Sequence, residues 1–307
     1  FKQNTAYEIM TCDWSSDVCS SDLVAAPRRG DRELQDADLQ RHDGDRPRRL
    51  VRHQHAHRRE AAVVERLVLE EGHVEFIGDQ GSRSGAEAVL ELIASEGADA
   101  VLHSGDFDYD DDPAGWDARI TSHLGADFPY FASIGNHDER EFYGSGGYQE
   151  RLAARMNRLG IPWQGDLGVQ SSFRFAGIFF VLTAPGIFGA GDGNHDRYIR
   201  DQLAADHSNW RITSFHKNME RLQVGDKNDA TGWGVYEESR RGGAIVATAL
   251  EHLYARTHLL SEMESQTVAS SDDTLVLARD DPATPEDEGR SFVFVSGLGG
   301  SSIRDQT

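Results

Sequence analysis

The stretch Val74–Gly81 reads VEFIGDQG, and two later stretches repeat its pattern: AVLHSGDFDY (Ala100–Tyr109) and YFASIGNHD (Tyr130–Asp138). Each begins with an apolar run as long as a buried strand and ends in a glycine followed by polar side chains. Helical spacing predicts one helix over 84–95 and a second from Pro113 to Leu124. This β-α-β-α-β order predicts a parallel sheet with right-handed crossovers.

The rest of the chain predicts further strands and helices around this unit. Residues 171–175 and 178–183 are typical of a hairpin or two adjacent strands, and a helix is expected over 196–205. A weak helical pattern covers 59–70. Further strands are predicted at these positions: 210–214, 244–247, 274–278 and 291–295. The alternation indicates an α/β protein with two sheets packed face to face and helices outside.

Polar side chains follow each of the three strands that decide the fold. Asp79 follows the first strand, Asp106 and Tyr109 follow the second, and Asn136 and His137 follow the third. Because the carboxyl ends of parallel strands meet at one edge of a sheet, we expect these side chains to lie close together. Carboxylate, phenolate, amide and imidazole groups together suit a pair of metal ions.

Composition narrows the choice of partners. The 307 residues carry a formal net charge of −21, which argues against a broad nucleic-acid surface. A phosphorylated small molecule or phosphoprotein remains a possible substrate, since bound metal ions reverse the local field. No run approaches the roughly 18 apolar residues of a membrane span. Both cysteines, Cys12 and Cys19, precede the organised region, so no disulfide framework is expected there.

The first seventy residues differ from the rest. Residues 1–23 resemble a translated sequencing-adapter leader, and we expect them to be an artefact; a natural disordered tail is the alternative. Residues 24–70 are rich in Arg, Asp and His and poor in aromatic residues, so we expect a disordered or misframed segment. The folded domain is expected over 71–307, truncated at its C-terminus.

The three motifs, together with His216 and His252, resemble the calcineurin-like metallophosphoesterase superfamily. The tyrosine in GDFDY points within it to the branch similar to purple acid phosphatases. The resemblance covers about Val74–Gly300. It implies a four-layer α/β/β/α sandwich of two mixed sheets and a two-metal site that hydrolyses phosphate monoesters with a metal-activated water. Relatives of this branch are often secreted, which makes secretion or a periplasmic location an expectation.

Roles are carried over from the resemblance by position. It implies Fe at a first site bound by Asp79, Asp106, Tyr109 and His252. It implies Zn, Mn or Fe at a second site bound by Asp106, Asn136 and His216, with Asp106 bridging the two ions. His137 is implied as the catalytic residue, placed beside the substrate phosphate. No other cofactor is implied.

One position departs from the family pattern. The family motif Gly-His-x-His aligns with Ala249-Leu250-Glu251-His252, so Leu250 replaces a ligand of the second metal. On a strand, Glu251 would face the opposite side and could not replace it. We therefore expect a weakened second site. Two alternatives stay open: a degenerate relative that binds metal or phosphate without useful turnover, and a phosphodiesterase.

Ordinary structural roles compete with the proposed ligands. Asp79 and Asp106 also suit turns, Tyr109 could be a rim aromatic, and the two histidines could serve only as hydrogen-bonding groups. The run Asp110–Asp112 indicates a solvated loop rather than a third metal site. The glycine-rich loop Phe142–Gly147 could shape a substrate pocket.

Overall fold

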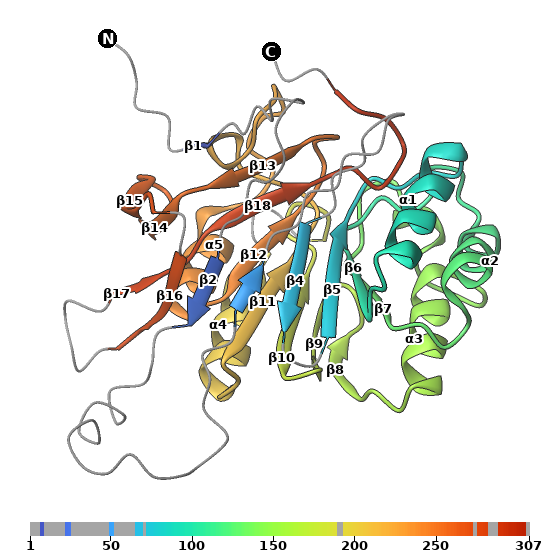
Figure 1. Cartoon of the computed structure of the whole chain (residues 1–307), viewed down its shortest axis with the longest axis horizontal. Helices are drawn as coiled ribbons and strands as arrows, with labels where there is room; N and C mark the ends of the chain where they lie inside the picture. Colours follow the sequence, from blue (N-terminus) through green and yellow to red (C-terminus); the bar gives the residue numbers. More distant parts are fainter. Residues whose placement is uncertain are drawn as a thin grey trace.

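The computed structural model describes residues 72–188, 193–272, 275–281 and 288–304, together with four short strand segments at 7–8, 22–25, 49–51 and 65–69. Within these residues the chain forms two main sheets packed face to face, with helices on both outer sides (Figure 1). This is the four-layer α/β/β/α sandwich expected from the sequence.

The first sheet has the strand order β4-β5-β6-β7. Its strands are β4 (Glu65–Leu69), β5 (Gly72–Ile77), β6 (Ala100–His103) and β7 (Tyr130–Ala132). The pairs β5–β6 and β6–β7 are parallel, as predicted. The prediction of a weak helix over 59–70 is wrong in its C-terminal half, because β4 pairs antiparallel with β5 there. Pairing with an open strand edge satisfies backbone groups and outweighs a weak local preference.

Three helices cover the outer face of this sheet: α1 (Ser84–Ser95), α2 (Pro113–Leu124) and α3 (Tyr148–Arg158). The apolar stripe of α1, including Val89 and Ile93, is buried, and Gly97 ends this region in a left-handed conformation. The Asp112 side chain caps α2 by accepting from the Gly115 N–H at 3.0 Å. The sequence pattern did not predict α3.

The second sheet has eight strands in the order β1-β13-β18-β12-β11-β10-β9-β8. Along the chain these are β1 (Tyr7–Glu8), β8 (Trp163–Asp166), β9 (Gln170–Phe175), β10 (Ile178–Thr183), β11 (Trp210–Ser214), β12 (Ile245–Thr248), β13 (Tyr254–Thr257) and β18 (Val293–Ser296). The predicted hairpin is confirmed, because β9 and β10 pair antiparallel. Strands β10, β11, β12 and β18 run parallel, so their following loops share one edge.

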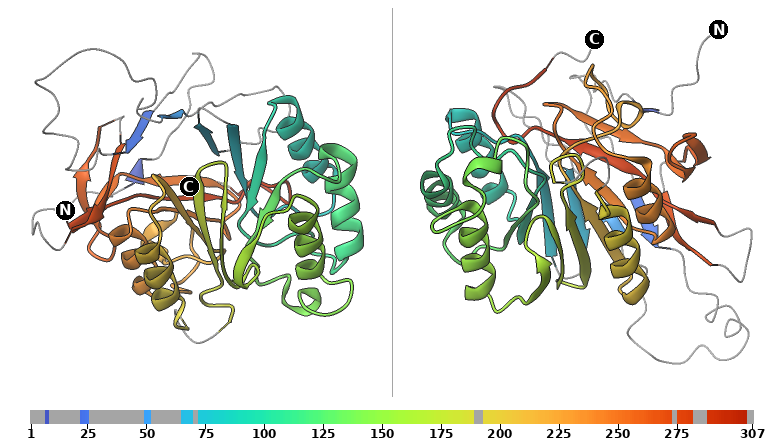
Figure 2. Two further views of the ribbon diagram at one scale, coloured as in Figure 1. Left: turned by 90° about the horizontal axis from the view of Figure 1, so that it is seen from below. Right: turned by 180° about the vertical axis from the view of Figure 1, so that it is seen from behind.

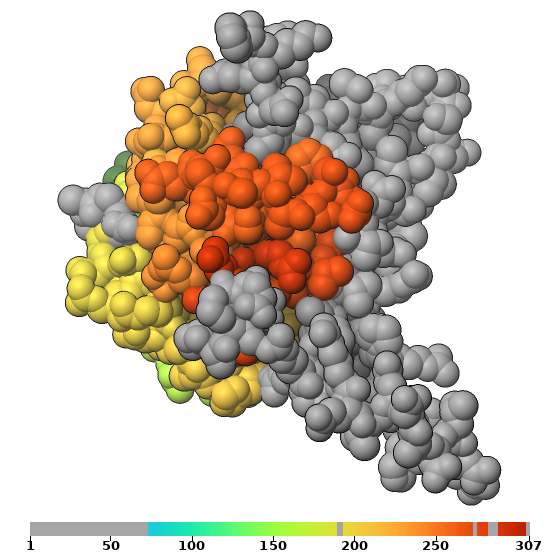
Figure 3. Space-filling view, turned by 90° about the vertical axis from the view of Figure 1, so that its left-hand side faces the viewer, coloured from blue at the N-terminus to red at the C-terminus, as the bar shows by residue number. Residues whose placement is uncertain are grey.

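Helices α4 (His195–Ala205) and α5 (Trp233–Arg241) cover the outer face of the second sheet (Figure 2). Single 3-10 turns lie at η2 (Glu139–Glu141) and η3 (Glu220–Leu222). A hairpin of β14 (Leu259–Glu262) and β15 (Thr267–Ser270) lies at the surface on the side away from α1–α3 (Figure 3). The remaining small sheet joins β17 (Glu288–Arg290), β16 (Leu275–Asp280), β2 (Asp22–Ala25) and β3 (Arg49–Val51).

Aromatic side chains join the two sheets. Phe76 of β5 meets Phe294 of β18 edge to face at 5.1 Å, and the Phe131 ring of β7 lies 4.6 Å from that of Phe173. All four side chains are buried in one apolar core. Burial of a Phe side chain stabilises the fold by about 1.5–3 kcal/mol. This packing fixes the two sheets so that loops from both meet at one edge of the sandwich.

Candidate metal centre

Two buried carboxylates from adjacent strands of the first sheet form the base of the candidate site. Asp79 follows β5 and Asp106 follows β6, and both are almost fully buried. The Asp79 N–H donates to the Gly105 carbonyl at 3.0 Å, which ties the two loops together. Both residues adopt left-handed backbone conformations, with φ of 56° and 60°. Such conformations cost about 1–3 kcal/mol each for a residue other than glycine, and they cluster at functional sites.

His216 joins these carboxylates from the second sheet, in the loop after β11. One ligand atom each from Asp79, Asp106 and His216 lie within 4.8 Å of one another. The His216 Nδ1 is 2.8 Å from the Ser104 carbonyl, so Nδ1–H donates there and Nε2 faces the carboxylates. Nε2 lies 3.2 Å from Asp106 Oδ2, yet among the described residues it has no partner in hydrogen-bonding geometry.

Tyr109 and His252 lie on the Asp79 side of this cluster. The Tyr109 hydroxyl donates to Asp79 Oδ1 at 2.9 Å and lies 3.1 Å from His252 Nε2. The same His252 nitrogen is 3.2 Å from Asp79 Oδ1. Its other nitrogen, Nδ1, bonds the Ser302 hydroxyl, which turns Nε2 toward the carboxylate. Metal-binding histidines are commonly held in this way.

Asn136 and His137 lie in the loop after β7. The His137 N–H donates to Asp106 Oδ1 at 3.0 Å, which places this loop against the bridging carboxylate predicted from the sequence. The His137 ring is exposed and lies 4.7 Å from the Tyr109 ring. The Asn136 side chain is half-buried beside it. The structure therefore brings loops that carry all seven predicted site residues to one edge of the sandwich.

Leu250 contacts the Asp79 carboxylate with its backbone. Its N–H donates to Asp79 Oδ2 at 2.9 Å, and its φ of 75° is unusual for a leucine. The expectation that Glu251 lies on a strand is wrong, because β12 ends at Thr248 and residues 250–253 form a bend. The buried carboxylate of Glu251 pairs through Oε2 with Arg304, whereas Oε1 has no hydrogen-bond partner among the described residues.

Charge within the cluster favours a cation. Burial alone would lower the pKa of His216, but the carboxylates of Asp106 and Asp79 raise it to about 9. Burial alone would raise the pKa of Asp106, but His216 and the His137 N–H hold it below its ordinary value. Burial and the neighbouring carboxylates raise the pKa of the Tyr109 hydroxyl. In the metal-free protein the cluster thus retains protons that a metal ion would displace.

Burial also shifts the pKa values of His103 and Asp138, two buried residues close to the cluster. Burial lowers the pKa of His103 to about 3, so its ring is neutral, and it lies 2.8 Å from the Tyr130 hydroxyl. Burial and the charge of Asp106 raise the pKa of Asp138 to about 8, although backbone N–H donors offset part of this rise. Neither residue was predicted to take part in the site.

The donor set fits metal ions. The carboxylates of Asp79 and Asp106 and the imidazole of His216 lie together, and the Nε2 atom of His216 has no hydrogen-bond partner among the described residues. Tyr109 and His252 contact Asp79. Buried charges of one sign are costly unless they are paired or coordinate a metal. Carboxylate and imidazole ligands together suit Zn, Fe or Mn ions. The second sheet offers one imidazole fewer than the Gly-His-x-His motif would supply, because Leu250 stands at the position of its first histidine.

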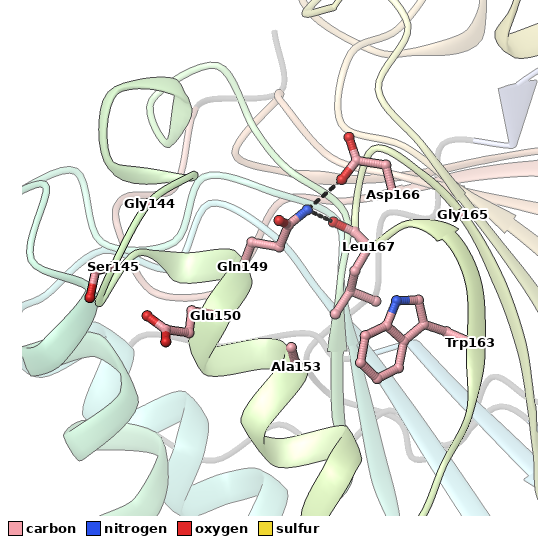
Figure 4. A pocket seen from close by; sticks show the side chains of 9 residues that line it. All are labelled: Gly144, Ser145, Gln149, Glu150, Ala153, Trp163, Gly165, Asp166 and Leu167. Carbon is pink, nitrogen blue, oxygen red and sulfur yellow. Dashed lines mark hydrogen bonds between the residues drawn. The ribbon is translucent and has the colours of Figure 1, made fainter.

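A cavity of about 420 Å³ lies beside the loop Phe142–Gly147, between α3 and β8. It is lined by the residues labelled in Figure 4, and Gln149 donates from its amide to Asp166 and to the Leu167 carbonyl. None of the predicted metal ligands lines it. The loop thus shapes a pocket, as the sequence suggested, but that pocket does not contain the candidate metal ligands.

Sequence reasoning missed Ser302 and the carbonyl of Ser104. Both orient an imidazole of the cluster through its Nδ1 atom. A serine hydroxyl and a backbone carbonyl carry no sequence signal for this role. The C-terminal segment that carries Ser302 is held near the site by a backbone hydrogen bond, in which the Ser301 N–H donates to the Asp79 carbonyl at 3.0 Å. Only the folded structure reveals this contact.

Comparisons with known proteins agree with this fold. The sequence profile of the calcineurin-like phosphoesterase family matches residues 55–237, which is more than half of the chain. Two sheets in a sandwich with buried carboxylates and imidazoles at one edge accord with this family. The chain belongs to the calcineurin-like phosphoesterase family.

Solved structures extend the comparison to the fold. The purple acid phosphatase PPD1 from yellow lupin (Lupinus luteus) seeds superposes with a TM-score of 0.52 at 17% identity, over 80% of this chain and 50% of that one. The chain therefore spans about half the length of the lupin protein. A structure of PhoD covers 92% of this chain and 70% of its own, at 12% identity and a TM-score of 0.41. No curated protein sequence matches the chain.

Family and fold together place the chain on the scaffold of calcineurin-like phosphoesterases. In the described residues no helix combines the length and the apolar character needed to cross a membrane.

Proposed function

We propose that this chain hydrolyses phosphate monoesters at a two-metal site built from the loops of both sheets. The observation that carries the proposal is the buried cluster of Asp79, Asp106 and His216, whose ligand atoms lie within 4.8 Å of one another. Two carboxylates and one imidazole buried this close together form a donor set that suits a bound metal ion. The family match supplies the reaction class.

Each ligand has a proposed place. Asp79, Tyr109 and His252 hold the first metal, because they contact one another at 2.9–3.2 Å. Asn136 and His216 hold the second metal. Asp106 would be shared by the two sites. Bound metal ions at such a site polarise a phosphoryl oxygen and lower the pKa of a coordinated water.

The protein's own residues complete the chemistry. His137 is the proposed catalytic residue, because its exposed ring lies at the mouth of the cluster, 4.7 Å from the Tyr109 ring. There it can donate a hydrogen bond to the phosphate of a substrate or a proton to its leaving group. Its backbone N–H fixes Asp106 Oδ1 at the same time.

The proposed metal at the first site is iron. A phenol within hydrogen-bond distance of Asp79 and His252 supports this choice, and the lupin purple acid phosphatase shares the fold. Zn, Mn or Fe is proposed at the second site. Because the pKa of the Tyr109 hydroxyl is raised in the metal-free protein, the phenolate forms only when a metal ion displaces its proton.

A second candidate function follows from Leu250. A side chain without a donor atom at this position leaves the second site with fewer ligands, and Glu251 is paired with Arg304 instead. The chain could then bind one metal ion, or a phosphate ligand, without useful turnover. The single-ion form would still use Asp79, Tyr109 and His252.

Metal analysis and hydrolysis assays separate these candidates. The protein is purified, loaded with Fe and Zn, and assayed with an aryl phosphate monoester and the corresponding bis-aryl diester. Two ions per chain and faster monoester cleavage support the proposal. One ion and no cleavage of either ester favour the binding function, and faster diester cleavage favours a phosphodiesterase.

A matched control variant excludes effects of stability alone. Asp206 is fully buried and paired with Arg174 and Arg211 at the opposite end of β11 from His216. Asp206→Asn should destabilise the fold without changing the number of metal ions bound.

A further inference from the structure

Asp138 is a fully buried carboxylate directly behind the candidate metal centre. Its Oδ2 accepts from the N–H groups of Asp106 at 2.9 Å and Gly135 at 2.7 Å. Its Oδ1 accepts from the Phe107 N–H at 2.8 Å. These three donors come from two different loops, one after β6 and one after β7. The carboxylate therefore joins both loops through backbone groups alone.

The loop that Asp138 holds carries backbone strain. Asp106 has φ of 60°, and the Gly135 backbone lies so close to it that an added Cβ would be 2.1 Å from the Asp106 nitrogen. A left-handed aspartate persists only where the surroundings determine its conformation. Three backbone N–H groups from two loops donate to the two oxygens of this one side chain, which fixes the loops relative to each other. The bonds to Asp138 are thus suited to hold Asp106 in this conformation.

We propose that Asp138 is a positioning residue that fixes the carboxylate of Asp106 and the loop of Asn136 and His137 in one arrangement for metal binding. We name Asp138 with the amides of Asp106, Phe107 and Gly135 the Asp138 clamp. The inference rests on the proposed function, since it assigns the purpose of the clamp to metal binding. It adds a residue to which that proposal gives no role.

The geometry explains why a carboxylate is needed. Three N–H donors converge on two oxygens, and an amide in this place would turn its NH₂ group toward at least one of them. That N–H would then be buried without an acceptor, which destabilises the arrangement of the two loops. Outer partners of metal ligands typically change metal affinity about 10–100-fold when they are replaced.

The test compares Asp138→Asn with the control Asp206→Asn and the parent chain. Zinc affinity is measured by chelator competition, and folding stability is measured by urea unfolding of the metal-free protein. Amide hydrogen exchange is followed at Asp106, Phe107 and Gly135. Both variants should lose stability. Only Asp138→Asn should bind zinc about 10–100-fold more weakly and exchange these three amides faster than Asp206→Asn does.

Asp138→Glu keeps both oxygens and serves as the second variant if Asp138→Asn does not fold. Its side chain is one methylene longer and displaces these oxygens from the three amides, so this variant should bind zinc more weakly than Asp206→Asn does. Parental zinc affinity in either folded variant, with fast exchange at the three amides, would overturn the proposal.

The two proposals can fail separately. If the parent chain binds no zinc, the proposed function fails, whereas hydrogen exchange still judges the clamp. Unchanged protection of the three amides in Asp138→Asn would then show that Asp138 positions nothing.

Discussion

The first sheet contributes Asp79, Asp106 and the loop of Asn136 and His137 to the candidate centre, whereas the second sheet contributes two histidines on either side of Leu250. The loops of the first sheet are tied to one another by backbone bonds to Gly105 and Asp138. On the second sheet, His216 and His252 are oriented one at a time, by a carbonyl and a serine. The position at which the sequence departs from the expected motif, Leu250, thus lies on the side with the simpler support.

The largest expected effect comes from the bridging carboxylate of the first sheet. Asp106→Asn removes the charge shared by both proposed metals and should lower kcat/KM at least about 1000-fold, since metal ions supply several kcal/mol of charge stabilisation. Steady-state assays with an aryl phosphate measure this loss. Asp206→Asn should keep activity near the parental value. Comparable losses in the two variants would mean that stability, and not metal binding, is measured.

His137→Gln should lower kcat about 100–1000-fold, because it removes a proposed donor to the phosphate and leaves the metal ligands in place. The bound metal, measured by atomic absorption, should be unchanged. His123→Gln on α2 is the control for a histidine away from the centre. A His137 variant with parental kcat would remove this residue from the reaction.

Leu250→His should strengthen binding of the second metal at least about tenfold, because it restores a ligand to the weaker side. Histidine also tolerates the φ of 75° at this position better than leucine. Titration with zinc after filling the first site measures the change. Leu250→Phe, a ring without a donor atom, should show no gain. Equal affinities in both variants would mean that position 250 does not face the second metal.

The smallest effect on rate is expected from Tyr109→Phe. With iron bound, the parent should show a visible phenolate-to-iron absorption band, which this variant should lose. Tyr143→Phe, whose parent hydroxyl bonds Asp166 at the surface, should retain the band. A colourless iron-loaded parent with full activity would exclude Tyr109 as a ligand of ferric iron.

Much of the fold could be predicted from the sequence because apolar runs and glycines mark its strands and turns. The strands β5, β6 and β7 and the helices α1 and α2 follow the expected ranges within a few residues. The α3 helix was missed because its apolar residues are few, and its buried Arg155 pairs with Asp117 rather than facing solvent. Strand β4 was missed because only the edge of β5 decides its conformation.

The candidate site could be predicted where the residue type alone indicates a metal ligand. Carboxylates and imidazoles after strands indicated the cluster of Asp79, Asp106 and His216. Asp138 gave no such signal, because its role depends on three backbone N–H groups that only the folded loops bring together. The bend at 250–253 was also unpredictable, since the left-handed Leu250 is held there by the Asp79 carboxylate.

The number of metal ions bound per chain, measured together with aryl phosphate hydrolysis before and after chelation, tests the account most directly. We expect up to two ions, the second held more weakly, and hydrolysis that is lost with chelator and restored by adding metal. Full hydrolysis in a chain that holds no metal ion, or no metal binding by the parent while Asp79 and Asp106 are intact, would contradict it.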